Sequence, residues 1–124
     1  MDLAPRRFAD TVVLAPAGRI DHATAESFRE ALAGPLAACA TGGDRLVLDL
    51  GGVEYIASVG LRALMMARKQ VKAQGGTLVV AAMQPVVREI FDISRFTMVF
   101  DTYPTVREAL AAISPVALAA FGPA

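Results

Sequence analysis

Apolar residues follow two patterns along the chain. Short runs of branched apolar residues predict buried strands, and they lie at residues 11–15, 45–50, 77–81 and 98–100. Longer stretches repeat apolar residues every three or four positions and predict helices, which lie at residues 24–38, 58–74, from 85 onwards and 105–113. Strands and helices in alternation predict a single α/β domain with a mostly parallel sheet of four to five strands and four helices.

The expected helices have recognisable ends and apolar faces. Pro35 predicts a kink or break in the first helix, and Gly75-Gly76 predicts the end of the second. Pro85 suits a first helical position. Thr105 and Glu108 have the spacing of a capping box at the start of the fourth helix. The expected inward-facing residues are Ala25, Phe28, Leu32, Leu36, Leu61, Leu64, Met65, Val71, Val86, Val87, Ile90 and Phe91.

The last residues form an apolar segment after the expected fourth helix. We therefore divide the chain into a domain at residues 1–113 and an apolar tail at residues 114–124. Three interpretations of the tail remain open. It could be a short helix packed on the domain, a surface for a homodimer, or a frayed end.

Composition and charge exclude several classes of protein. The chain is 55% apolar, and its twelve basic residues balance its twelve acidic ones. Such a chain is neither disordered nor basic enough for nucleic acid or an anionic membrane. Cys39 is the only cysteine and His22 the only histidine, so we expect no intramolecular disulfide and no metal site built from cysteines or histidines. We also expect no metal and no cofactor in the protein's function. We find no secretory signal and no apolar stretch long enough for membrane insertion, which predicts a cytoplasmic protein.

Two segments that join strands to helices are candidates for function. Pro16-Ala17-Gly18 ends one strand, and residues 18–26 then form a loop before the first helix. Gly51-Gly52 ends another strand, and residues 53–61 carry Ser58 to the start of the second helix. Because loops at the carboxyl ends of parallel strands gather at one edge, we expect these segments to be neighbours.

Ser58 has two interpretations from its position alone. Free backbone N–H groups and the helix dipole meet at a helix N-terminus, where a phosphate is well tolerated. Serine is equally a preferred helix cap. In the other loop, Asp21 or Thr24 could start the first helix, and His22 is expected to be a solvated surface residue. Gly60 should permit close approach by another backbone.

A catalytic interpretation finds little support. Ser58, His22 and Asp21 nominally supply a nucleophile, a base and an acid, but Asp21 directly precedes His22 and is poorly placed to orient it. The Gly-x-Ser-x-Gly pattern fails because Ile56 occupies the first glycine position, and glycine-rich phosphate loops do not occur. We therefore predict a binding protein and not an enzyme.

Three stretches resemble the STAS domain family, and in particular the stand-alone bacterial anti-sigma factor antagonists. They are residues 18–26, with the Gly-x-x-Asp loop; residues 46–61, with the central strand and phosphorylation loop; and residues 75–94. The resemblance covers about residues 8 to 112. It implies a protein that binds an anti-sigma factor, often a serine-protein kinase, and so regulates sigma-factor-dependent transcription.

The resemblance also implies a site. The phosphoacceptor of the family falls on Ser58, and phosphorylation there would release the partner until a phosphatase resets the switch. The family commonly has Asp before this serine and a hydroxyl residue after it, where this chain has Ala57 and Val59. The residues that we assign to partner binding are Asp21, His22, Thr24, Ala57, Ser58, Val59, Gly60 and Arg62. STAS domains also occur in lipid-transport ABC systems and stressosomes, so a subunit without the switch is the alternative.

Overall fold

A mostly parallel five-stranded sheet forms the centre of the molecule in the computed structural model, which describes residues 1–123. Its strand order is β1-β2-β4-β6-β7. The β1 strand is antiparallel to β2, and the other neighbouring pairs are parallel. The strands are β1 (Arg6–Phe8), β2 (Thr11–Leu14), β4 (Arg45–Asp49), β6 (Leu78–Ala81) and β7 (Thr102–Tyr103). The predicted α/β class and mostly parallel sheet are confirmed.

A second, two-stranded parallel sheet was not predicted from the sequence. It consists of β3 (Ala17–Ile20) and β5 (Gly52–Ile56). Sequence analysis assigned these residues to breaks and loops, which is wrong. Both strands begin with small residues, and the pairing register shifts between Gly18 and Arg19. These features hide the alternation that identifies a strand.

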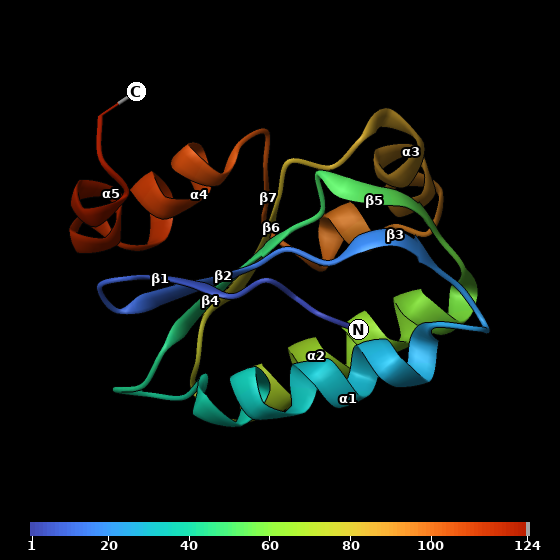
Figure 1. Cartoon of the computed structure of the whole chain (residues 1–124), viewed down its shortest axis with the longest axis horizontal. Helices are drawn as coiled ribbons and strands as arrows, with labels where there is room; N and C mark the ends of the chain where they lie inside the picture. Colours follow the sequence, from blue (N-terminus) through green and yellow to red (C-terminus); the bar gives the residue numbers. More distant parts are fainter. Residues whose placement is uncertain (124) are drawn as a thin grey trace.

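Helices cover both faces of the central sheet (Figure 1). They are α1 (Ala25–Ala38), α2 (Ser58–Ala73), α3 (Pro85–Ile93), α4 (Val106–Ile113) and α5 (Pro115–Phe121). The α1 and α2 helices pack side by side on one face, α4 and α5 lie on the other, and α3 lies beside β5. The four predicted helices are confirmed, and the tail contributes a fifth among residues 1–123.

Two local predictions need correction. The predicted break of the first helix at Pro35 is wrong, because α1 continues to Ala38 and Leu36, beyond the proline, is anchored in the core. The alternative of a kink at Pro35 stays a prediction. Residues 98–100 do not form a strand. Phe96–Met98 forms a short 3-10 helix, η1, and the edge strand comes later at β7.

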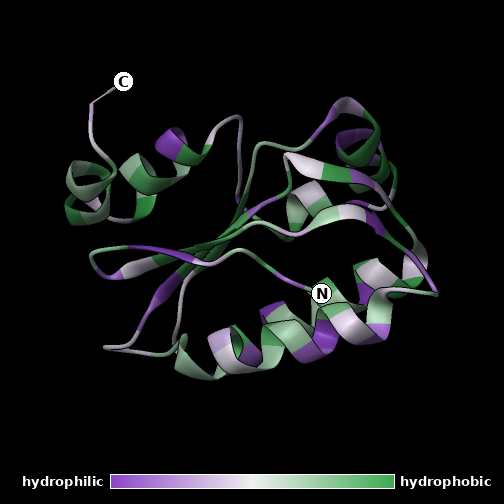
Figure 2. Ribbon diagram, viewed as in Figure 1, coloured by the Kyte–Doolittle hydropathy of each residue, from purple (hydrophilic) through white to green (hydrophobic). Residues whose placement is uncertain are grey.

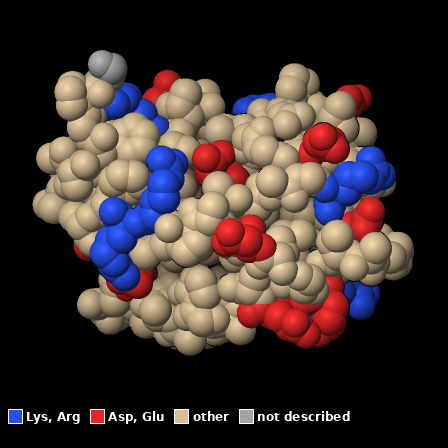
Figure 3. Space-filling view, viewed as in Figure 1, with Lys and Arg blue, Asp and Glu red and all other residues tan. Residues whose placement is uncertain are grey.

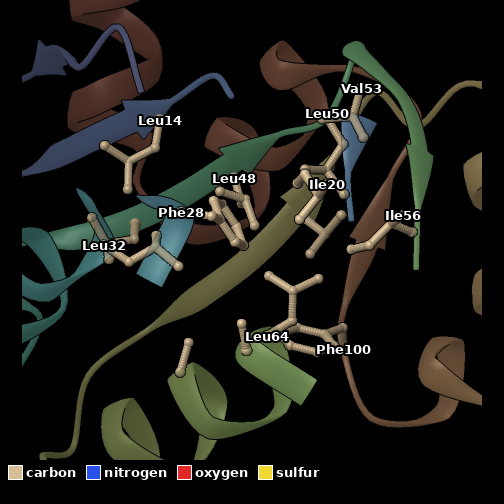
Figure 4. Packing of buried hydrophobic residues seen from close by; sticks show 14 of the residues in the cluster. Leu14, Ile20, Phe28, Leu32, Leu48, Leu50, Val53, Ile56, Leu64 and Phe100 are labelled. Carbon is tan, nitrogen blue, oxygen red and sulfur yellow. The ribbon is translucent and has the colours of Figure 1, made fainter. Parts of the chain in front are cut away.

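The sheet separates two apolar clusters because β4 is buried on both faces. Leu46 and Leu48 point toward α1 and α2, whereas Val47 belongs to the cluster beneath α4 and α5. Figure 2 shows the resulting concentration of hydrophobic residues on the central strands. Figure 4 shows Leu48 and Phe28 within the larger cluster. This arrangement is expected of a parallel strand covered by helices on both sides.

Most of the predicted inward-facing residues contribute to the core. Phe28, Leu32, Leu36, Leu64, Val71, Val87 and Phe91 are buried, and Ala25, Leu61, Met65 and Ile90 are half-buried. Val86 is 52% exposed, so its inward assignment is wrong, whereas the inward assignment of its neighbour Val87 is confirmed. The predicted cap at Thr105 is confirmed, since its hydroxyl oxygen accepts the Glu108 N–H at 3.1 Å.

The tail forms α5 and packs on its own domain. Ala117 is fully buried. The Phe121 ring meets the Phe8 ring edge-on, with 5.1 Å between the two ring centres. At the start of α5, the buried Ser114 hydroxyl donates to Asp10 at 2.6 Å and accepts the Ala117 N–H at 3.2 Å. The packed short helix is therefore the correct interpretation of the tail's fold. The boundary at residue 113 and a homodimer through the tail stay predictions.

We expect Ser114→Ala to lower the free energy of unfolding by about 0.5–2 kcal/mol, because the first turn of α5 loses its cap. The Ser114 hydroxyl is also the main reason why the pKa of Asp10 lies below its ordinary value. A depressed carboxyl pKa stabilises the fold above the pKa of the unfolded state, and this contribution disappears as pH falls through the lower, folded-state pKa. Ser114→Ala should therefore lose less stability on acidification than the parent chain does.

Urea unfolding of both proteins at neutral pH and at about pH 3 measures both effects. Thr105→Ala is the matched control, because it removes the cap of α4 without touching Asp10. Thr105→Ala should lower the free energy of unfolding by the same amount at both pH values. Unchanged stability of Ser114→Ala, or an acid response equal to that of the parent chain, would contradict the prediction.

Candidate functional site

The β5 strand delivers Ser58 to the surface at the first turn of α2. Ala57 occupies the cap position, and its carbonyl accepts the N–H groups of Gly60 and Leu61 at 3.0 Å. Ser58 is exposed and begins the helix, so the interpretation of Ser58 as the cap is wrong. The N–H groups of Ser58 and Val59 have no partner within the helix, as at every α-helix N-terminus. An exposed hydroxyl therefore stands beside the positive end of the α2 dipole.

A hydrogen-bonded turn holds the segment between β3 and α1. The Asp21 carboxylate accepts the Ala23 N–H at 3.0 Å. The Thr24 hydroxyl donates to the Arg19 carbonyl at 2.8 Å and accepts the Asp21 N–H at 2.9 Å. Thr24 is the residue before α1, as one of the two predictions stated, but its side chain does not cap that helix. His22 is exposed at the turn, as expected.

Arg19 connects this turn to β5. Its guanidinium lies 4.5 Å from the centre of the Tyr55 ring, and its Nε is 3.6 Å from the Asp21 carboxylate. Asp21 is thus engaged by Arg19 and by its own turn. This role is structural, and it differs from that of an acid which orients a catalytic histidine.

The two candidate segments are neighbours, as predicted. The Ala57 N–H donates to the Ile20 carbonyl at 2.8 Å, which joins the end of β3 to the start of α2. Gly60 is buried where these elements meet. A Cβ at this position would lie 2.7 Å from side-chain carbons of both Ile20 and Ile56. Side chains, and not the predicted backbone, therefore make the close approach to Gly60. Figure 4 shows Ile20 and Ile56 in the same part of the core.

Two adjacent hollows open beside this junction. The first, about 270 Å³, brings His22, Val59 and Arg62 together with Glu26 and Arg29 of α1. The second, about 510 Å³, contains Ser58 and Arg62. The remaining lining residues of the second hollow are Leu61, Met65, Met66, Lys69 and Phe96.

Sequence reasoning missed several residues of this surface, among them Met66, Lys69 and Phe96. The first two could have been found from helical spacing. Residues eight and eleven positions after Ser58 lie on the same side of a helix. Phe96 could not have been found in this way. It belongs to the 3-10 helix, and sequence analysis predicted that this segment precedes a strand. Figure 3 shows that basic and acidic side chains occur in separate small groups on the face drawn, so charge alone does not mark the site there.

The chain belongs to the STAS domain family, whose model matches residues 4–109. It is 41% identical over 101 residues to BtrV of Bordetella bronchiseptica, which is named as an anti-sigma factor antagonist; the match covers 82% of this chain and 84% of BtrV. The resemblance that the sequence motifs suggested is confirmed. No helix within residues 1–123 has both the length and the apolar character that a membrane span requires.

Solved structures agree with this assignment. An anti-sigma factor antagonist from Mycobacterium paratuberculosis superposes with a TM-score of 0.78 at 28% identity, over 88% of this chain and 90% of that chain. An anti-sigma factor antagonist domain protein from Planctomyces limnophilus has a TM-score of 0.80 at 22% identity, over 91% and 98% of the two chains. At 22% identity, the similarity to the Planctomyces limnophilus protein shows a shared fold alone.

We expect Gly60→Ala to lower the free energy of unfolding by about 1–3 kcal/mol, because the added methyl group overpacks the contact with Ile20 and Ile56. Urea unfolding followed by circular dichroism measures the change. Gly34→Ala on α1 is the control, since no atom other than those of its chain neighbours and its own helix backbone lies within 4 Å of the added group. At Gly34 the gain in helix propensity opposes the steric crowding before Pro35. The free energy of unfolding should therefore change by less than about 0.5 kcal/mol. Equal stability of Gly60→Ala and the parent chain would contradict the packing argument.

Proposed function

We propose that this protein is an anti-sigma factor antagonist whose binding is switched off by phosphorylation of Ser58. The partner is an anti-sigma factor with serine-protein kinase activity, and a phosphatase restores the unmodified form. The antagonist and the anti-sigma factor act in the cytoplasm. The antagonist itself is a binding protein and not an enzyme. The residues that we assign to partner binding are Asp21, His22, Thr24, Ala57, Ser58, Val59, Gly60 and Arg62. Gly60 is buried, so its contribution is to hold the first turn of α2 in place beneath the surface. The relationship to BtrV supports the general role.

One observation carries the phosphorylation step, which is the exposure of Ser58 as the first residue of α2. Its hydroxyl is available to a kinase because it does not occupy the helix cap. Of the four serines in the chain, Ser27 is half-buried and Ser114 is buried, so only Ser58 and Ser94 are exposed. Ser94 lies at the end of α3, away from a helix N-terminus. Position alone thus distinguishes Ser58 from Ser94.

Electrostatics supports a switch that acts on the partner and leaves the fold intact. A phosphate adds about −1.5 to −2 charges at neutral pH. At the start of α2 this charge is favoured by the helix dipole, so the modified domain should remain folded. A partner that contacts the same surface would meet a new charge and a bulky group, and its affinity would fall.

Ala57 favours a second candidate function. The family commonly has an acidic residue before the phosphoacceptor, and a kinase that requires that residue would not modify Ser58. In this second candidate the chain is a STAS subunit of a lipid-transport ABC system or of a stressosome, and it binds its partner without a phosphorylation switch.

Ser58→Ala and Ser58→Glu separate the two candidates. We expect the Ala variant to retain a kinase-like anti-sigma factor from a lysate of the host, and the Glu variant to lose it, with mass spectrometry as the readout. Ser94→Glu is the matched control, because it places the same charge at the other exposed serine. The recovered partner, purified and supplied with ATP, should phosphorylate the parent chain but not Ser58→Ala.

Equal recovery of the same partners by all three variants would reject the switch. Recovery of an ABC-transporter ATPase by all of them would establish the second candidate. Loss of the partner from Ser94→Glu as well would show that general charge, and not the position of Ser58, controls binding.

A further inference from the structure

Met66 lies where three surface hollows meet. Its side chain is 56% exposed although it is large and apolar. It lines the two hollows described above and a third of about 310 Å³ between α1 and α2. The hollows share lining residues and follow α2 from Ser58 to Gln70, on either side of the exposed Met66. We call the three hollows together the α2 groove.

Apolar side chains and small residues form the middle of the α2 groove. Leu32, Leu36, Ala63 and Ala67 lie beside Met66, and all four are buried from solvent by their neighbours. Ala63 and Ala67 are small and lie where α1 packs against α2, so Met66 is the apolar side chain that this part of the groove exposes. An exposed methionine adapts its shape to the side chains of a partner. This part of the surface therefore favours an apolar contact.

The rim of the α2 groove is predominantly basic. Arg29, Arg62 and Lys69 line it, whereas Glu26 is the one acidic residue that does so among residues 1–123. Glu26 forms an ion pair with Arg29, which neutralises one of the three positive charges. The four ion pairs within the described part of the chain include neither Arg62 nor Lys69. Their charges remain available to an acidic partner.

We propose that the α2 groove receives an acidic amphipathic helix of the anti-sigma factor. This inference rests on the proposed function and names the chemistry of the partner. The apolar face of the incoming helix covers Met66, and its acidic residues face Arg62 and Lys69. The groove follows α2 over twelve residues, about 18 Å at the rise of an α-helix, which corresponds to about three turns of the incoming helix.

The same arrangement explains how a single phosphate at Ser58 would release the partner. Ser58, Arg62 and Met66 are four residues apart in turn, so they follow one side of α2. A phosphate at Ser58 stands at the end of the groove and opposes the acidic residues of the partner. Its charge of about −1.5 to −2 also offsets most of the positive charge of the two unpaired basic residues that attract the partner.

The test uses the full chain and two labelled synthetic helices of about 18 residues, followed by fluorescence anisotropy. One peptide has leucines along one face and glutamates beside them; the other replaces the glutamates by lysines. We expect the acidic peptide to bind at least about tenfold more tightly. Met66→Asp and Arg62→Glu should each weaken its binding by at least about tenfold. Added salt should weaken binding as well.

Two substitutions elsewhere on the surface serve as matched controls. Lys72→Glu reverses a charge on α2 outside the groove, and Val116→Asp places an acid at an exposed apolar residue of α5. Each should change the affinity less than about twofold, as expected of residues outside an interface. Met66→Ala accompanies Met66→Asp, so that a loss caused by misfolding can be recognised from thermal unfolding.

Equal affinity for both peptides, or binding that Met66→Asp and Met66→Ala leave unchanged, would overturn the inference. Sedimentation of the chain alone provides a further check. Self-association that Met66→Asp abolishes would show that the occupant is a second copy of the chain, and this too would overturn the inference.

Measurements with the anti-sigma factor separate this inference from the proposed function. Ser58→Glu could block the binding of the anti-sigma factor while Met66→Asp and Arg62→Glu do not. That result would support the proposed function and reject the docking of a helix in the α2 groove. If no anti-sigma factor binds the parent chain, while the acidic peptide binds at the groove, the proposed function is wrong, and the groove accepts an acidic helix that belongs to a different protein.

Discussion

The position of the candidate site depends on the contact between Gly60 and the isoleucines at the ends of β3 and β5. Ile20 and Ile56 fill the space that a side chain at Gly60 would require. The hydrogen bond from the Ala57 N–H to the Ile20 carbonyl fixes the same junction through the backbone. The small sheet therefore holds the first turn of α2 against the turn that contains His22. Without this contact, Ser58 and the residues around it would not share a surface.

This construction places function on rigid elements. Ser58 and Arg62 lie on a sixteen-residue helix packed on the central sheet, and Asp21 is fixed by its own turn and by Arg19. A rigid surface loses little conformational entropy when a partner binds. It also responds to a phosphate chiefly through charge and shape, since the fold itself has no reason to change. The apolar tail is remote from this surface, because α5 covers the opposite face of the sheet (Figure 1).

The sequence predicted the central sheet and its helices because their signals are strong and local. Leu46, Val47 and Leu48 form an uninterrupted apolar run, and α2 has clear helical spacing with a glycine stop. The small sheet escaped prediction because its strands start with small residues and their pairing register is interrupted by a bulge. Their pairing is stabilised by tertiary contacts, which local propensity does not register. Val86 was misassigned for a related reason, since two adjacent valines leave open which one enters the core.

The candidate site shows the same division between local and tertiary information. Motif spacing identified Ser58 and the turn near Asp21, and the topology then placed them together. Met66 and Phe96 belong to the surface only because α1, α2 and the 3-10 helix meet there. This matters for specificity. Residues such as Ser58 and Gly60 belong to motifs that resemble those of the family, and we propose that they define the kind of interaction. The groove around Met66 lies outside those motifs, and its shape and charge are what can make the interaction selective for one partner.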